Sequence, residues 1–304
     1  MSLGYNQRLY LLPFDHRHSY LAGMFHASPP LTTEQRQAVI GSKRVIYDGF
    51  RLALICNVSS VHAGILVDEE FAADILRNAT RHGYVTALST EKSGSEEFEF
   101  EYGASFAKHI EIFRPTFAKA LVRYNPEGDE ALNKRQTARL RQLSDYCRTE
   151  EQKFMLELLV PATEEQQRRV SGESEKYDRE IRPSLVLEII RTLQDAGVEP
   201  DIWKIEGLDH HYDCEQVVAT ARRDGRVDVG CIVLGRAGDD AKVTSWLAIA
   251  ASVPGFIGFA VGRTTFWNAI ADLIADKSTR EEAVSRIAQR YGEWAAIFDR
   301  AHVE

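Results

Sequence analysis

The stretch DIWKIEG, residues 201–207, places a lysine inside what is otherwise a buried apolar strand. Its core, IWKIE (202–206), has the length and the β-branched and aromatic composition of a strand. Burying a charge such as that of Lys204 is costly unless the charge is paired or used. Two interpretations follow: a lysine paired with a carboxylate on an edge strand, or a catalytic amine inside a barrel.

Short apolar runs of this kind recur along the chain, and amphipathic segments separate them. The eight runs are LYLLPFD (9–15), AGILVD (63–68), YVTALS (84–89), AKALVRY (118–124), FMLELLV (154–160), IWKIE (202–206), VGCIVL (229–234) and FIGFAV (256–261). Runs of this composition are typical of parallel strands that are covered on both faces. Helices are expected at 33–53, 68–82, 130–150, 184–196, 214–223 and 240–252, with a Ser278/Glu281 capping box before a last helix.

Eight strands alternating with helices over 304 residues predict an α/β fold, a single (β/α)₈ TIM barrel spanning residues 1–304. A doubly wound open sheet is the alternative, but no glycine fingerprint follows the first strand. We assign EFEFEYG (97–103) to an extended connection between the third and fourth strands. The charged stretch 163–183 is an extended insert after the fifth strand, either solvated loop and helix or a lid.

Composition excludes several classes of protein. The formal net charge is −8 and no basic stripe is present, so nucleic acid is not an expected partner. No apolar run has membrane-spanning length, and the first residues lack the pattern of a signal peptide. The four cysteines, at 56, 147, 214 and 231, are scattered, which indicates reduced thiols in a cytoplasmic protein. The sequence leaves open whether the chain forms a homo-oligomer.

Charged residues gather at the carboxyl ends of the predicted strands, where barrel active sites form. They are Asp15, His16, Arg17, Glu91, Lys92, Lys119, Arg123, Glu157, Lys204, Glu206, Arg236 and Arg263. Burial and a neighbouring like charge favour the neutral form of a lysine amine, which can attack a carbonyl and form a Schiff base. Lys204, with Lys119 nearby, is the candidate. Simple pairing of Lys204 with Glu157 or Glu206 is the structural alternative.

Two glycine–arginine pairs predict a phosphate site. Gly235-Arg236 and Gly262-Arg263 follow the seventh and eighth strands, where barrels of this class commonly bind phosphate through backbone N–H groups and a helix N-terminus. The alternative is two surface arginines beside tight turns.

A metal site is a weaker hypothesis. His210 and His211 lie beside Asp209 and Asp213, but adjacent histidine side chains usually diverge and seldom bind one ion. We therefore expect no metal and no cofactor. A glycosidase pair among Glu91, Glu157 and Glu206 is not favoured, because lysines and arginines surround these carboxylates.

Several motifs resemble a known enzyme family. LLPFDHRHS (11–19), FAKALVRYNPEGD (117–129) and DIWKIEG (201–207) are similar to the tagatose-1,6-bisphosphate aldolase type of class I (Schiff-base) aldolase. The stretch 231–267, CIVLGRAGDDAKVTSWLAIAASVPGFIGFAVGRTTFW, is more closely similar to the aldolase-like domain fused behind the myo-inositol-catabolic kinase 5-dehydro-2-deoxygluconokinase. The resemblance runs over essentially the whole chain. It implies a carbon–carbon lyase of carbohydrate metabolism that acts on a sugar phosphate.

The resemblance also implies roles for individual residues. Lys204 would form the Schiff base, Glu157 would shuttle protons, and Lys119 and Asp15 would set charge and orient hydroxyls. The substrate phosphate would bind near Arg263 and Arg236. Where the tagatose enzymes continue with a KVE-P-V-type sequence, this chain has KIEGLDHH, and FDHRHS replaces their DQR-type motif. These departures concern the substrate more than the chemistry.

The implied products are dihydroxyacetone phosphate and an aldehyde. The inositol link favours 5-dehydro-2-deoxy-gluconate 6-phosphate as substrate and malonate semialdehyde as the aldehyde, with Arg17 or His16 meeting its carboxylate. The alternatives are a tagatose-1,6-bisphosphate-type aldolase, a metal-dependent sugar-phosphate lyase or isomerase that uses Asp209, His210 and His211, and a non-catalytic sugar-phosphate sensor or kinase partner.

Overall fold

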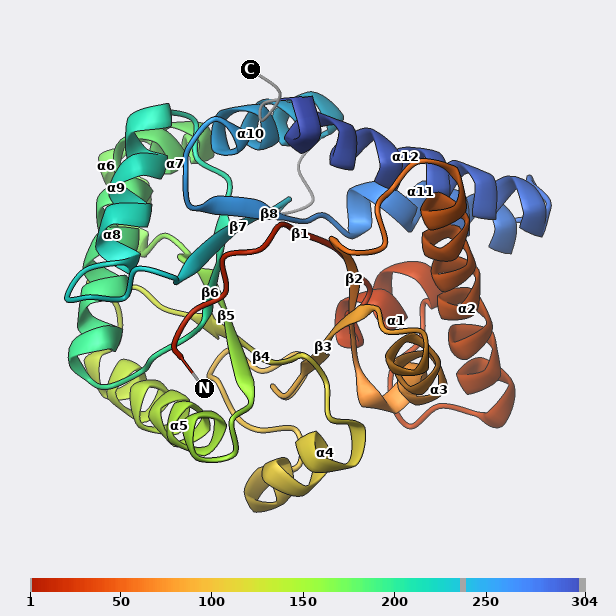
Figure 1. Ribbon diagram of the computed structural model, residues 1–304, viewed down its shortest axis with the longest axis horizontal. Helices are drawn as coiled ribbons and strands as arrows, with labels where there is room; N and C mark the ends of the chain where they lie inside the picture. Colours follow the sequence, from red (N-terminus) through yellow and green to blue (C-terminus); the bar gives the residue numbers. More distant parts are fainter. Residues whose placement is uncertain (1, 236–238, 301–304) are drawn as a thin grey trace.

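Eight parallel strands close into a barrel in their order along the chain, and helices surround it (Figure 1). The computed structural model describes residues 2–235 and 239–300. The strands are β1 (Leu9–Pro13), β2 (Ala63–Val67), β3 (Val85–Ser89), β4 (Phe117–Arg123), β5 (Lys153–Leu159), β6 (Ile202–Glu206), β7 (Gly230–Leu234) and β8 (Phe256–Ala260). The predicted TIM barrel is confirmed, and the open-sheet alternative is wrong because β1 pairs with β8.

The helices lie outside the strands and cover them with apolar side chains. They are α1 (His18–Phe25), α2 (Thr33–Cys56), α3 (Glu69–Arg81), α4 (Phe106–Phe113), α5 (Glu130–Thr149), α6 (Glu164–Arg169), α7 (Ser174–Glu180), α8 (Arg182–Asp195), α9 (His211–Ala221), α10 (Asp240–Ala251), α11 (Arg263–Ile274) and α12 (Arg280–Arg300). None of the helices in the described part of the chain is long and apolar enough to cross a membrane. The predicted Ser278/Glu281 capping box is off by one residue, since Thr279 and Glu282 exchange these bonds.

The floor of the barrel is apolar, and the segment before β1 closes it. The floor consists of Leu9, Leu11, Leu66, Ala87, Phe117, Met155, Ile202, Ile232, Ile257 and Ala260. Tyr5 packs its ring edge-on against Phe117. Lys153 binds the carbonyls of Ser2 and Gly4 and the carboxylate of Asp201, which fixes this segment across the amino ends of the strands. Access to the barrel interior is therefore from the carboxyl ends.

After β3 the chain forms a hairpin before it reaches α4. Glu91 pairs antiparallel with Phe100, and the N–H of Lys92 donates to the carbonyl of Glu99 at 2.8 Å. EFEFEYG (97–103) supplies the returning arm, which confirms its place between the third and fourth strands. Phe98 and Phe100 are buried, and Phe100 stacks on Phe106 of α4 at 4.0 Å between ring centroids.

The insert after β5 is folded against the barrel. It contains α6, α7 and the start of α8. The Tyr177 hydroxyl donates to the Val160 carbonyl at 2.9 Å. Arg182 is fully buried and donates to Asp178 at 3.0 Å and to the carbonyl of Gly207 at 2.7 Å. Buried anchors of this kind are not expected in a lid that opens.

Substitution of the buried anchor in this insert should destabilise the whole barrel. We expect Arg182→Ala to lower the free energy of unfolding by about 3 kcal/mol or more, because it leaves buried carbonyls and a carboxylate without their donor. Arg179→Ala, at an exposed arginine of α7, is the matched control and should change it by less than about 1 kcal/mol. Urea unfolding measures both, and equal effects of the two substitutions would contradict this account.

Candidate active site

A cavity of about 320 Å³ opens at the carboxyl ends of the strands. Strand geometry explains why charged side chains reach it. Successive side chains of a strand alternate between its two faces, so a residue two positions after a floor residue points into the barrel one layer higher. The three pairs are Phe117 and Lys119, Met155 and Glu157, and Ile202 and Lys204. The apolar floor thus supports a charged layer at the base of the cavity.

Lys119 is the centre of that charged layer. Its ammonium lies 2.9 Å from Asp15 Oδ2, 2.7 Å from Glu91 Oε1 and 2.8 Å from Glu157 Oε2. Burial opposes the charged form, but the three carboxylates outweigh it and hold the pKa of Lys119 well above its ordinary value. Lys119 is therefore a fixed cation, and it links the ends of four strands, β1, β3, β4 and β5.

Lys204 is held by one carboxylate. Its side chain is 5% exposed, and its Nζ lies 2.7 Å from Glu157 Oε1. The register that sets Glu157 opposite Lys204 on neighbouring strands produces this contact. Glu206, the other partner considered from the sequence, instead accepts the Val160 backbone N–H at 2.8 Å.

The carboxylates of this layer differ in their proton affinities. Burial raises the pKa of Glu157, but the ammonium groups of Lys119 and Lys204 outweigh burial and leave it lowered. Asp15 also has a lowered pKa, because Lys119, His16 and Lys204 overcome the effect of its burial. Glu91 has a raised pKa, because burial and the nearby Asp15 outweigh the attraction of Lys119 and Arg17.

Glu91 is the member of this cluster for which the sequence motifs predict no role in the site. It lies two residues after β3, as Asp15 does after β1, so its position at a strand end was the available signal. Its contact with Lys119 depends on the hairpin, which single-strand patterns do not predict.

His16 lines the same cavity. Burial lowers the pKa of His16 to about 4, although the negative charge of Asp15 acts to raise it. The imidazole is therefore neutral near pH 7. Its Nδ1 is buried without a hydrogen-bond partner and lies 4.0 Å from Asp15 Oδ1, too far for a hydrogen bond.

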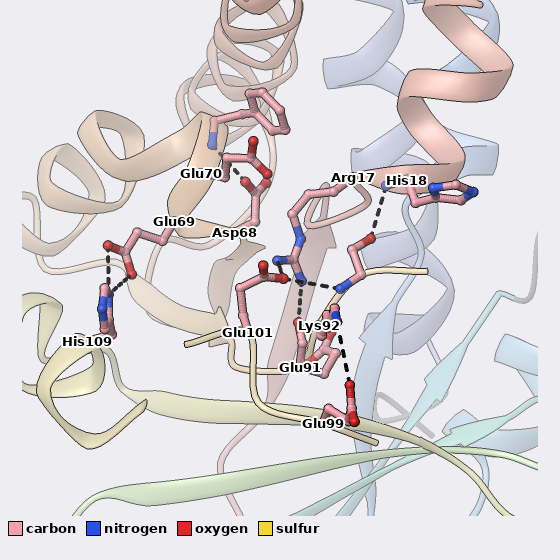
Figure 2. A network of polar contacts seen from close by, with 12 residues as sticks. Arg17, His18, Asp68, Glu69, Glu70, Glu91, Lys92, Glu99, Glu101 and His109 are labelled. Atoms are coloured by element: carbon pink, nitrogen blue, oxygen red, sulfur yellow. Dashed lines mark hydrogen bonds and ion pairs between the residues drawn. The ribbon is translucent and has the colours of Figure 1, made fainter. Parts of the chain in front are cut away.

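Arg17 lies at the wall of the cavity and uses both terminal nitrogens on the hairpin. Its Nη1 donates to Glu101 Oε2 and its Nη2 donates to the carbonyl of Glu91, each at 2.5 Å (Figure 2). Glu101 also accepts the Ser93 N–H at 3.2 Å. This geometry fits a side chain that holds the hairpin in place, so a contact of Arg17 with substrate stays a prediction.

The tip of the hairpin borders the cavity. Ser93, Gly94 and Ser95 line it, and the Ser93 hydroxyl accepts the backbone N–H of His18 at 3.0 Å. Gly94 has φ +79°, and a Cβ there would lie 3.0 Å from the His18 ring, so a larger residue is strained. No residue of 163–183, all of which the structure describes, lines the cavity. The segment over the site is therefore the β3–α4 hairpin.

Three of the four residues predicted to bind phosphate line the same cavity. Gly235 after β7, and Gly262 and Arg263 at the start of α11, all line it. A Cβ on Gly262 would lie 2.2 Å from the carbonyl oxygen of Pro13, so only glycine fits between β8 and β1. Burial lowers the pKa of Arg263 from its ordinary value. Arg236 falls outside the described residues.

The residues of the metal alternative have other partners. Asp209 accepts the indole N–H of Trp246 at 2.7 Å and pairs with Lys242 at 2.8 Å. His211 is half exposed and faces Glu215 one turn along α9. Within residues 2–235 and 239–300, no group of three or more His, Cys, Asp or Glu side chains could hold a metal ion.

The charge of Lys119 should control how stability depends on pH. In the unsubstituted protein, the lowered pKa values of Asp15 and Glu157 contribute stability that is present above the unfolded carboxyl pKa of about 4 and lost as pH falls. Lys119→Met leaves Asp15, Glu91 and Glu157 buried together, with pKa values above their unfolded ones. Its stability is then greatest near and below pH 4 and is lost as pH rises.

We therefore expect the melting temperature of Lys119→Met to fall further below that of the unsubstituted protein at pH 8 than at pH 5. Loss of a buried pairing partner costs about 3–5 kcal/mol where the carboxylates are charged. Lys134→Met removes an exposed pair with Glu130 and is the control, with a small difference at both pH values. An equal difference in melting temperature between Lys119→Met and the unsubstituted protein at pH 5 and pH 8 would contradict the expectation.

Solved structures with this fold include two aldolases. A fructose-bisphosphate aldolase of Plasmodium falciparum is 12% identical, with 97% of this chain and 91% of that chain covered at a TM-score of 0.64. The Corynebacterium glutamicum protein Cgl0159 is 15% identical, covering 95% and 87% at 0.56. A fructose-bisphosphate aldolase of Slackia heliotrinireducens is 14% identical, covering 92% and 85% at 0.54. At these identities the likeness is one of fold.

No curated protein matches the chain. A family model does, and it spans residues 4–302, nearly the whole sequence. The chain therefore belongs to the family described as "Uncharacterized protein conserved in bacteria (DUF2090)".

Proposed function

We propose that this protein is a class I aldolase that cleaves a phosphorylated keto-sugar or keto-sugar acid through a Schiff base on Lys204. The observation that carries the proposal is a buried lysine amine at the base of a barrel cavity, in contact with one carboxylate, Glu157. The aldolases with the same fold lend support. The products would be dihydroxyacetone phosphate and an aldehyde, as the sequence resemblance implies.

The contacts of the two buried lysines favour Lys204 over Lys119 as the nucleophile. Lys119 donates to three carboxylates, so it would have to break three charged contacts before it could attack. Lys204 has one such contact, and the carboxylate that makes it could also accept the ammonium proton. Lys119 would then serve to set the charge of Asp15 and Glu157.

The chemistry follows from these groups. The Lys204 amine adds to the substrate ketone, and loss of water gives a protonated imine, with Glu157 placed to shuttle the protons. The imine then accepts the electron pair of the carbon–carbon bond that breaks. Asp15 and the neutral His16 are placed to orient hydroxyl groups. The phosphate would bind near Arg263 and the backbone of Gly235 and Gly262.

The proposed substrate is 5-dehydro-2-deoxy-gluconate 6-phosphate, which would release malonate semialdehyde. This choice rests on the similarity of 231–267 to the aldolase-like domain of the inositol-catabolic kinase. A fructose-bisphosphate substrate would carry a second phosphate in place of the carboxylate. Comparison of turnover with the two substrates distinguishes them.

The Schiff base can be trapped directly. Incubation with dihydroxyacetone phosphate and borohydride should add the mass of the reduced adduct to Lys204, located by peptide mass spectrometry. Lys204→Met should lose the adduct, whereas Lys134→Met, at an exposed lysine of α5, should keep it. Absence of an adduct on folded protein that binds dihydroxyacetone phosphate would contradict the aldolase proposal and favour a sugar-phosphate sensor.

The phosphate site can be tested with the same adduct. We expect Arg263→Met to raise the half-saturating concentration of dihydroxyacetone phosphate by about 10- to 100-fold, because a charge-assisted hydrogen bond contributes about 1.5–3 kcal/mol. Adduct formation at saturation should persist. Arg280→Met, at an exposed arginine of α12 that pairs with Asp48, is the control. An unchanged half-saturating concentration for Arg263→Met would place the phosphate elsewhere.

A further inference from the structure

Glu91 carries an oxygen that the rest of the cluster does not satisfy. Oε1 contacts Lys119, but Oε2 is buried without a hydrogen-bond partner, and the residue lines the cavity. Among the described residues, this is the one carboxylate oxygen in that condition. Buried polar atoms are nearly always hydrogen-bonded. An unpaired oxygen on a residue that lines the cavity is therefore suited to a ligand that supplies the missing partner.

The other two carboxylates are less available for proton transfer with a substrate. Both oxygens of Glu157 are held by ammonium groups, Oε1 by Lys204 and Oε2 by Lys119. Asp15 has one oxygen, Oδ2, held by Lys119, as Glu91 has Oε1. Glu157 therefore has no oxygen left for a substrate hydroxyl, and Asp15 has a lowered pKa, whereas Glu91 has a raised pKa and hence a higher proton affinity.

The hairpin fixes Glu91 in this position. Arg17 binds its carbonyl (Figure 2). The antiparallel bridge to Phe100 fixes its main chain. The charged groups that face its carboxyl are Lys119 from β4, Asp15 from the end of β1, and Arg17 before α1. Glu91 follows β3, whereas Gly262 and Arg263 follow β8, which is not a neighbour of β3 in the barrel. A substrate whose phosphate binds near Arg263 would present its aldehyde half to Glu91.

We propose that Glu91 is a further catalytic residue, whose Oε2 exchanges a proton with the substrate hydroxyl at the bond that breaks. This inference rests on the proposed aldolase activity. In cleavage, Oε2 takes the hydroxyl proton, the hydroxyl oxygen becomes the aldehyde carbonyl, and the carbon–carbon electron pair passes into the imine on Lys204 to give an enamine. In condensation, the protonated Glu91 returns the proton to the new alkoxide. Glu157 then serves the imine steps alone.

The test separates the imine from the bond-forming step. Exchange of the C3 hydrogen of dihydroxyacetone phosphate with deuterium oxide needs the imine and enamine but no aldehyde. Condensation with malonate semialdehyde or glyceraldehyde also needs the proton that Glu91 would supply. We expect Glu91→Gln to lower the ratio of condensation to exchange by about 100-fold or more. Glu99→Gln, at an exposed carboxylate on the same hairpin, should change the ratio by less than about twofold.

The pH profile gives a second readout. Cleavage requires ionised Glu91, so its rate should fall as pH drops through a value above the ordinary carboxyl pKa of about 4.3. Glu91→Gln should remove this limb, and Glu91→Asp, which keeps a carboxyl one methylene shorter, should retain it at a shifted pH. If Glu91→Gln fails to fold, Glu91→Asp decides, because an unshifted limb would overturn the proposal.

The remaining outcomes are equally decisive. An unchanged ratio in Glu91→Gln, with the Lys204 adduct still forming, would overturn the role of Glu91 and leave the aldolase proposal intact. If the unsubstituted protein catalysed exchange but no condensation with either aldehyde, the role of Glu91 would also be overturned. There would then be no bond-forming step for Glu91 to serve. Absence of both adduct and exchange in the unsubstituted protein would overturn the proposed function, and this inference with it.

Discussion

The charged cluster around Lys119 is the constraint on which the rest of the site depends. An ammonium that is 99% buried would be very costly alone, and three carboxylates in contact with it supply the compensation. Those carboxylates come from residues 15, 91 and 157, which are far apart in sequence. One buried cation therefore fixes four strand ends relative to one another, and the cavity takes its shape from that arrangement.

The same cluster gives the two lysines different properties. Lys119 must remain charged to balance its neighbours, whereas Lys204 shares a single carboxylate with it through Glu157. The negative charge of Glu157 is thus shared by the two buried lysines. If the proposed imine replaced the Lys204 ammonium, a positive charge would stay in the same place and the cluster would not need to reorganise. Preorganisation of this kind is the main electrostatic contribution to catalysis.

Much of this arrangement could be predicted from strand periodicity. The eight apolar runs give the barrel, and the positions of Lys119, Glu157 and Lys204 within them place these side chains inside it. Contacts between distant segments could not be predicted. Arg17 bonds to Glu101, and Glu91 reaches Lys119, because of a hairpin with a single antiparallel bridge. The insert 163–183 has a lid-like composition, but its buried Arg182 and Tyr177 bind it to the barrel.

The apolar floor determines the surroundings of this cluster. Beneath it the barrel is filled with side chains, and the segment before β1 closes the far end. Water therefore reaches the charges from the cavity alone, which keeps the local dielectric low and makes each contact strong. A substrate that fills the cavity would remove that water as well. Among the described residues that line the cavity, three buried side-chain atoms have no hydrogen-bond partner: Glu91 Oε2, His16 Nδ1 and Arg17 Nε. A bound ligand would be suited to supply those partners.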